Sequence, residues 1–129
     1  MKKKFFIFVF CFLIFSQNAF TYSSDPKHFI QEIVDDAKKI LVKSNSKEFK
    51  TKELSKLALE TVDIKGVAYY TIGKYRKELN DEQMKKYLEL FEKYFLKSFT
   101  SRLSDYSDPK INVISTDVLN EKYTIVKSI

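Results

Sequence analysis

One face of the segment 81–104 carries a large apolar side chain at every third or fourth position, and this feature constrains the fold most. The stripe consists of Met84, Tyr87, Leu88, Phe91, Phe95, Phe99 and Leu103. Apolar residues at this spacing indicate an α-helix that turns one face toward other parts of the protein. At 1.5 Å per residue the helix would be about 36 Å long, enough to form one whole wall of a small domain.

The sequence also marks where this helix begins and ends. Asn80, followed three residues later by Gln83, resembles a capping box. The run Ser107-Asp108-Pro109 comes after the helix, and the residue before a proline avoids the helical conformation. The chain has only 2 glycines and 2 prolines in 129 residues. This scarcity favours long uninterrupted helices over a fold made of many turns.

A further helix is expected near residue 25, where Asp25 can act as its cap and Pro26 fits its first turn. Its apolar face consists of Phe29, Ile30, Ile33, Val34, Ala37, Ile40 and Leu41. The polar residues 43–47 predict a loop after it. These signals together predict one amphipathic helix that packs along a single stripe.

Two shorter helices are expected between this loop and the long helix. Residues 48–60 predict one helix, with Leu54, Leu57 and Ala58 facing inward. Asp63 can cap the next, which Gly73 can end in a left-handed conformation.

Two strands are expected after the long helix. Residues 111–116 are rich in β-branched side chains, residues 116–122 indicate a polar turn, and residues 123–129 indicate a second strand. A block of helices followed by strands is typical of the α+β class.

Residues 1–23 have the three-part layout of a secretory signal peptide. Residues 2–4 are lysines and residues 5–15 are apolar, and small or polar residues follow. Eleven apolar residues would span about 16 Å as a helix, against about 30 Å for a bilayer core, so we expect cleavage rather than anchoring. Cleavage can follow Ala19 or Ser23, and export through the secretory pathway is predicted.

Removing this leader changes both the charge and the thiol content of the chain. The formal net charge is +6, but three of the 23 basic residues lie in the leader, which leaves 20 against 17 acidic residues and a net charge of +3. That charge is too weak to predict nucleic-acid binding. Cys11, in the leader, is the 1 cysteine, so the mature protein has no disulfide and its stability must come from packing.

The sequence offers little for catalysis. His28, the 1 histidine, is expected to be solvated at a helix start, and no partner ligands at metal-site spacing accompany it. Asp35 and Asp36 are neighbours, which do not face each other on a helix, so we interpret them as a solvated face. No nucleophile elbow, phosphate-binding loop or dinucleotide motif is present. We therefore expect that the protein is not an enzyme.

Three stretches of the chain, taken in order, resemble the periplasmic phospholipid carriers of the toluene-tolerance or MlaC family, the auxiliary components of a lipid ABC transporter. They are residues 29–34 (FIQEIV), residues 62–64 with 72–75 (VDI and IGKY), and residues 80–83, 87–91 and 102–107 (NDEQ, YLELF and RLSDYS). Residues 125–128 (IVKS) are similar to the family's next strand. Arg76 departs from the family's pattern, because an aromatic residue is common there.

The resemblance implies an α+β fold in which an N-terminal layer of about four helices packs on a curved antiparallel sheet. Only the first two strands of that sheet would be present, so residues 24–129 would form a carrier domain that lacks the family's C-terminal strands and helix. Such a truncated chain would be the product of a degraded or split gene, or would need a second chain to complete its sheet.

The resemblance also implies the function. A carrier of this family shuttles phospholipid between an outer-membrane lipoprotein complex and an inner-membrane lipid ABC transporter complex, which maintains outer-membrane lipid asymmetry. It needs no cofactor, and its ligand is phospholipid. Helical phase and the family's architecture together predict the residues that line the lipid site: Val67, Tyr75, Tyr87, Phe91, Phe95, Phe99, Leu103, Val113 and Ile125.

Two alternatives stay open from the residues alone. An aromatic stripe on a helix is more often plain core than a ligand site, and periodicity cannot separate the two. The chain can also be a secreted helical module whose apolar stripes dock on a partner protein without any lipid.

Overall fold

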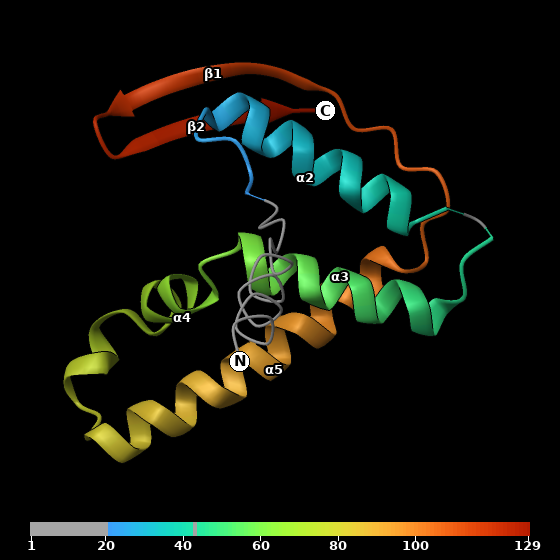
Figure 1. The fold of residues 1–129 in the computed structure, drawn as a ribbon. Helices are drawn as coiled ribbons and strands as arrows, with labels where there is room; N and C mark the ends of the chain where they lie inside the picture. The colour runs from blue at the N-terminus through green and yellow to red at the C-terminus, as the bar shows by residue number, and fades with distance from the viewer. Residues whose placement is uncertain (1–20, 43) are drawn as a thin grey trace, which may run out of the picture.

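The computed structural model describes residues 21–42 and 44–129 (Figure 1). The predicted leader falls mostly in residues 1–20, outside the described residues. The described helices are α2 (Pro26–Ile40), α3 (Lys47–Thr61), α4 (Ile64–Ile72), the 3-10 helix η2 (Gly73–Lys77) and α5 (Asp81–Leu103). They precede an antiparallel hairpin of β1 (Val113–Asn120) and β2 (Tyr123–Ser128). The α+β class is confirmed.

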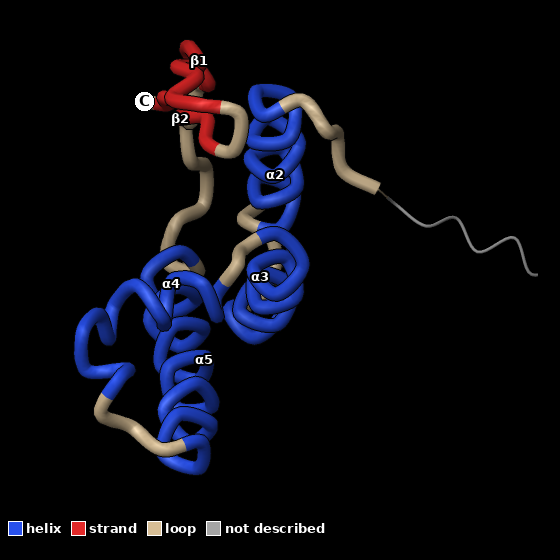
Figure 2. Tube along the Cα trace, turned by 90° about the vertical axis from the view of Figure 1, so that its left-hand side faces the viewer, coloured by secondary structure: helices blue, strands red, loops and turns tan. Residues whose placement is uncertain are grey.

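The elements form two packed groups that α3 joins. Figure 2 shows the hairpin beside α2 at one end of the molecule and α4 with α5 at the other. Both strands pack against α2, whereas α3 packs against α2 on one side and against α5 on the other. The core follows this arrangement. Its buried apolar residues are Val34, Leu41, Leu54, Leu57, Ala58, Ile64 and Ala68.

Three of the predicted helix starts are confirmed, because each rests on a local hydrogen bond. The Asp25 side chain accepts from the backbone N–H of His28, and the Asp63 side chain accepts from that of Gly66. A Cβ on residue 66 would collide with the Asp63 carboxylate in this position, so a larger residue there would require the Asp63 side chain to shift. Asn80 and Gln83 form the complete capping box at the start of α5.

Two details of the helical region differ from the sequence prediction. Helix α3 begins one residue earlier than expected, because the side chain of Ser46 accepts a hydrogen bond from the backbone N–H of Phe49 and caps the helix. Gly73 has a φ of 57° and a ψ of −128°, so the predicted positive φ is confirmed but its ψ is not that of the left-handed helical region. The chain then turns into η2, a 3-10 helix that the sequence did not predict.

The second strand is confirmed at Tyr123–Ser128, but the bounds of the first strand and the turn were predicted wrongly. The first strand does not end at residue 116 but continues to Asn120, and the turn is correspondingly tight. The Asn120 side chain accepts hydrogen bonds from the backbone N–H groups of Lys122 and Tyr123 at 2.9 and 3.0 Å, which fixes this turn. Before it, the side chains of Asp117 and Lys127 form an ion pair across the strands at 2.5 Å. Residues 116–120 of the predicted turn therefore belong to an exposed strand, and residues 121 and 122 form the turn.

Three lysines hold the segment that connects α5 to β1. Lys47 forms an ion pair with Asp105 at 2.6 Å, and Lys50, which is buried, donates to the Tyr106 carbonyl oxygen at 3.2 Å. Lys38 of α2 donates to the carbonyl oxygen of Ile111 at 3.2 Å. These contacts lead the chain across the ends of α3 and α2, so the hairpin comes to lie on α2.

The interpretation of Asp36 as part of a solvated face was wrong, because the chain before α2 covers it. The Tyr22 hydroxyl donates to Asp36 at 3.1 Å, Lys39 donates to Asp36 at 2.8 Å, and the ring of Tyr22 contacts Phe29 edge-on. Burial, then the hydrogen bond and charge of Asp36, raise the pKa of Tyr22 to about 12. The hydrogen bond from Lys39 is the main cause that lowers the pKa of Asp36.

Leu54 tests the position of the core. It is 0% exposed, whereas Leu59 on the same helix is 52% exposed. We expect Leu54→Ala to lower the free energy of unfolding by about 2–5 kcal/mol, because it leaves a cavity. Leu59→Ala should change it by less than about 0.5 kcal/mol. Urea denaturation measures both, and equal losses would contradict this placement of the core.

Tyr22 gives a test by pH. Its folded pKa lies above the ordinary value of 10.0, so the stabilisation from the neutral phenol is complete below pH 10 and is lost between pH 10 and about 12. Asp36→Asn should move the pKa of Tyr22 toward 10.0 without reaching it, because burial remains. Ultraviolet titration of phenolate formation measures this shift. Asp35→Asn is the matched control, and an equal shift there would contradict the assignment.

Candidate functional site

Four aromatic side chains of α5 follow one another along the helix at intervals of four residues. We call Tyr87, Phe91, Phe95 and Phe99 the aromatic ladder. Ring centroids lie 5.8 Å apart from Tyr87 to Phe91, 6.4 Å from Phe91 to Phe95 and 5.9 Å from Phe95 to Phe99. The last two pairs are stacked with interplanar angles of 22° and 9°. The ladder is a continuous apolar surface, and every ring in it is half-buried rather than sealed.

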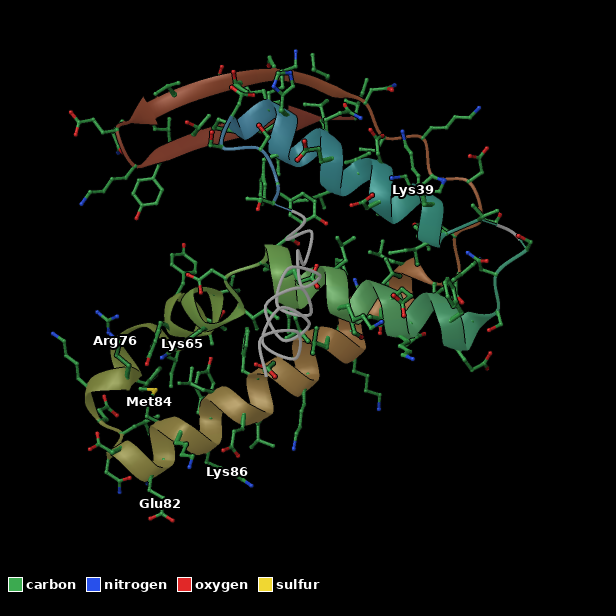
Figure 3. The ribbon with its side chains drawn as sticks, viewed as in Figure 1. Lys39, Lys65, Arg76, Glu82, Met84 and Lys86 are labelled. Atoms are coloured by element: carbon green, nitrogen blue, oxygen red, sulfur yellow. The ribbon has the colours of Figure 1, made fainter. Side chains whose placement is uncertain are left out.

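Helical phase shows which way the ladder faces. Figure 3 shows Met84 pointing from α5 toward α4, whereas Glu82 and Lys86 point away from α4. At 3.6 residues per turn, Phe91 and Phe95 lie within about 20° of the direction of Met84, and the other two rings lie within about 60° of it. The ladder therefore runs along the face of α5 that packs against α4, and continues past α4 toward α3.

An apolar pocket opens at the N-terminal end of the ladder. It has a volume of about 690 Å³ and lies between η2 and α5. We call it the η2 pocket, and it is lined by Ile72, Tyr75, Leu79, Glu82, Gln83, Lys86, Tyr87 and Leu90. Apolar side chains form most of this lining, while the charged residues come from the face of α5 that points away from α4. A concave apolar site with a few polar groups at its edge suits a ligand with a long apolar part.

Tyr87 links the pocket to the ladder. Its ring belongs to both, and its hydroxyl donates to the carbonyl oxygen of Ala68 at 2.9 Å. Ala68 is buried in α4, so this bond fixes α4 on α5 and sets the orientation of the first ring of the ladder. A buried tyrosine hydroxyl usually finds such a partner.

The structure brings six of the nine predicted lipid-site residues into one region. Tyr75 and Tyr87 meet in the η2 pocket, although they were chosen from different elements, and Phe91, Phe95 and Phe99 extend from it. Leu103 follows the ladder in the last turn of α5 and is half-buried. A lipid role for these residues stays a prediction.

The other three predicted residues lie elsewhere. Val113 and Ile125 belong to the hairpin, which packs on α2, so the expected wall of strands opposite the ladder is not formed by β1 and β2. Thr124 and Val126 are half-buried while Ile125 between them is 45% exposed, so Ile125 faces away from α2. Val67 is 40% exposed on α4.

Sequence reasoning missed three apolar residues of the pocket: Ile72, Leu79 and Leu90. Leu90 lies off the stripe that defined the helix face, and it lines the pocket together with Tyr75 of η2. Ile72 and Leu79 flank η2 on either side, and no pattern predicted that turn. The sequence signal that could have identified Ile72 and Leu79 as pocket residues was that they are isolated apolar residues on either side of the segment that begins at Gly73.

Other chemistry finds no support in the described residues. His28 is exposed and pairs with Asp25 at 3.4 Å in the first turn of α2. No three His, Cys, Asp or Glu side chains within residues 21–42 and 44–129 gather closely enough to hold a metal ion. Over the same ranges, no helix combines the length and the apolar character that a membrane span requires.

Comparison with known families gives one result. The family model described as MlaC protein matches residues 27–129, which include every described helix and strand except the first residue of α2. No curated protein and no solved structure matches the chain.

Tyr87→Phe tests the link between the pocket and the ladder. The variant keeps the ring and loses the hydrogen bond to Ala68, so the free energy of unfolding should fall by about 0.5–1.5 kcal/mol. Tyr94→Phe is the matched control, since Tyr94 is 70% exposed on the same helix and should tolerate the change. Thermal unfolding measures both, and an unchanged Tyr87→Phe would show that the bond does not fix α4 on α5.

Proposed function

Since this chain belongs to the MlaC protein family, we propose that it is a periplasmic phospholipid-binding protein that carries lipid between the outer and inner membranes. In this role it maintains outer-membrane lipid asymmetry. The observation that carries the proposal is the continuous apolar surface that begins in the η2 pocket and extends along the aromatic ladder.

The energetics of lipid transfer explain why such a surface is needed. Each buried methylene group is worth about 0.8 kcal/mol, so a tail of ~14 methylenes that leaves a bilayer loses roughly 11 kcal/mol of burial. Only a continuous apolar surface of comparable area can offset this loss. The ladder spans three steps of four residues, about 18 Å of helix at 1.5 Å per residue, which suits contact with an extended acyl chain.

The polar groups of the site suit orientation of the ligand rather than catalysis. Glu82, Gln83 and Lys86 line the η2 pocket together with its apolar residues. A lipid headgroup stays in contact with water, so a few polar side chains at the pocket edge are sufficient to orient it. We therefore propose binding and release of phospholipid, without a cofactor and without a covalent step.

Family membership also supports the identity of the partners. We propose that the protein receives or delivers phospholipid at an inner-membrane lipid ABC transporter complex and at an outer-membrane lipoprotein complex. Export to the periplasm through the N-terminal leader is part of the same proposal.

A second candidate function is a helical module that docks on another protein without lipid. The observation in its favour is the number of large apolar side chains left exposed on the hairpin, among them Val118, Leu119 and Tyr123. The two functions differ in what co-purifies with the protein. Extraction with organic solvent followed by mass spectrometry should give stoichiometric phospholipid for the carrier. A protein free of lipid, even after incubation with phospholipid vesicles, would support the docking module.

Phe95→Ala tests whether the ladder holds the lipid. Removing a ring from the middle of the apolar surface should weaken phospholipid binding by about tenfold, because a buried aromatic side chain is worth about 1.5–3 kcal/mol and Phe95 is half-buried. Tyr94→Ala removes the neighbouring, exposed ring and should leave the affinity unchanged. Binding of a fluorescent phospholipid measures both affinities, with circular dichroism as the check on folding. Equal affinities would remove the ladder from the site.

A further inference from the structure

The segment of α4 and η2 has a composition unlike the rest of the chain. Residues 64–77 contain four basic and no acidic residues, together with three tyrosines. Three of the basic residues lie in η2, and one aromatic residue lies among them. We call Lys74, Tyr75, Arg76 and Lys77 the η2 patch, and all four side chains are exposed.

The η2 patch lies on a projecting part of the molecule. Helix η2 is at the outer edge of the protein in two views that differ by 90°, beyond both α4 and the start of α5 (Figures 1 and 2). Figure 3 shows Arg76 pointing outward there. Tyr70, on the preceding turn of α4, is 89% exposed. A surface that projects in this way can approach a flat partner without a clash from the other helices.

The chemistry of the patch fits the surface of an anionic lipid bilayer. Lys and Arg side chains are attracted to negatively charged headgroups. Tyrosine prefers the boundary between acyl chains and water, because it has an apolar ring and a polar tip. The ammonium of Lys74 lies 5.5 Å from the ring centroid of Tyr75, so one basic and one aromatic group are presented together.

A protein partner fits this composition less well. Protein interfaces are enriched in tyrosine and arginine but depleted in lysine, and two of the three basic residues of the patch are lysines. A polybasic cluster beside exposed aromatic rings is instead typical of segments that lie on membranes.

The patch and the η2 pocket share a residue. Tyr75 is exposed on the patch and also lines the pocket with Ile72 and Leu79. A bilayer in contact with η2 would therefore lie against the opening of the pocket, and a lipid tail could pass between the two without crossing bulk water.

We propose that the η2 patch docks the protein on the surface of an anionic phospholipid bilayer, with the η2 pocket facing that bilayer. This goes beyond lipid binding in the proposed function, because it assigns a membrane-contact surface to the chain itself. Docking depends on charge, so it weakens as salt is raised and the headgroup charges are screened.

Vesicle co-sedimentation tests the proposal. The protein is purified in the mature form that remains after processing in its host. It is then mixed with vesicles of phosphatidylglycerol and phosphatidylcholine, or with vesicles of phosphatidylcholine alone. Each basic side chain near an anionic surface contributes about fivefold to binding, so the triple variant K74Q/R76Q/K77Q should bind the anionic vesicles on the order of 100-fold more weakly. The matched control is K52Q/K93Q/K122Q, which changes the net charge equally at exposed sites outside the patch. It should keep wild-type binding.

Three outcomes overturn the proposal: equal binding by the two triple variants, equal binding of the wild type to both kinds of vesicle, and wild-type binding that salt does not weaken. Circular dichroism verifies that both variants fold, and the single variant Arg76→Gln, with an expected loss of about fivefold, replaces the triple variant if that one does not fold. Mass spectrometry of co-purifying phospholipid separates docking from the proposed function. If the triple variant of the η2 patch retains phospholipid, the membrane-contact surface is separate from the lipid site. If the wild-type protein contains no phospholipid, the proposed carrier function is contradicted, but the vesicle-binding result is not affected.

Discussion

The structure depends on the way in which α5 is held by α3 and α4 while its aromatic face stays half open. The Tyr87 hydroxyl bond to Ala68 and the buried contacts of α3 fix α5 from two directions. Neither partner covers the ladder completely, so its four rings stay half-buried. Apolar surface that remains in contact with water is unfavourable unless another group covers it. An acyl chain along the ladder would remove that cost, and this is the physical reason for assigning a lipid to this surface.

Local features of the fold could be predicted from the sequence because their causes are local. The caps at Asp25, Asp63 and Asn80 each depend on a hydrogen bond to a backbone group three residues away. The length of α5 followed from its apolar stripe in the same way. These interactions are encoded within one or two helical turns, so a single sequence is sufficient to recognise them.

The placement of the hairpin could not be predicted, since its causes are distant in the chain. Lys38 bonds to Ile111 and Lys50 to Tyr106, pairs that are 73 and 56 residues apart. Nothing in a lysine's own neighbourhood shows which carbonyl oxygen it will reach. For the same reason the sequence placed Val113 and Ile125 opposite the ladder, whereas the structure has them on α2. The site was predictable only in part. The ladder followed from periodicity, but the η2 pocket needed the unforeseen turn after Gly73.

The most direct test of the central claim is to locate the acyl chain on the protein. The protein is deuterated except at its phenylalanine rings, and the bound phospholipid keeps protonated acyl chains. Nuclear Overhauser effects between the lipid and the rings can then be measured. The account predicts contacts from the acyl methylenes to Phe91, Phe95 and Phe99, and weaker or no contacts to Phe29, which lies on α2 and packs against Tyr22. A bound lipid whose acyl protons contact Phe29 and none of the three ladder phenylalanines would contradict it.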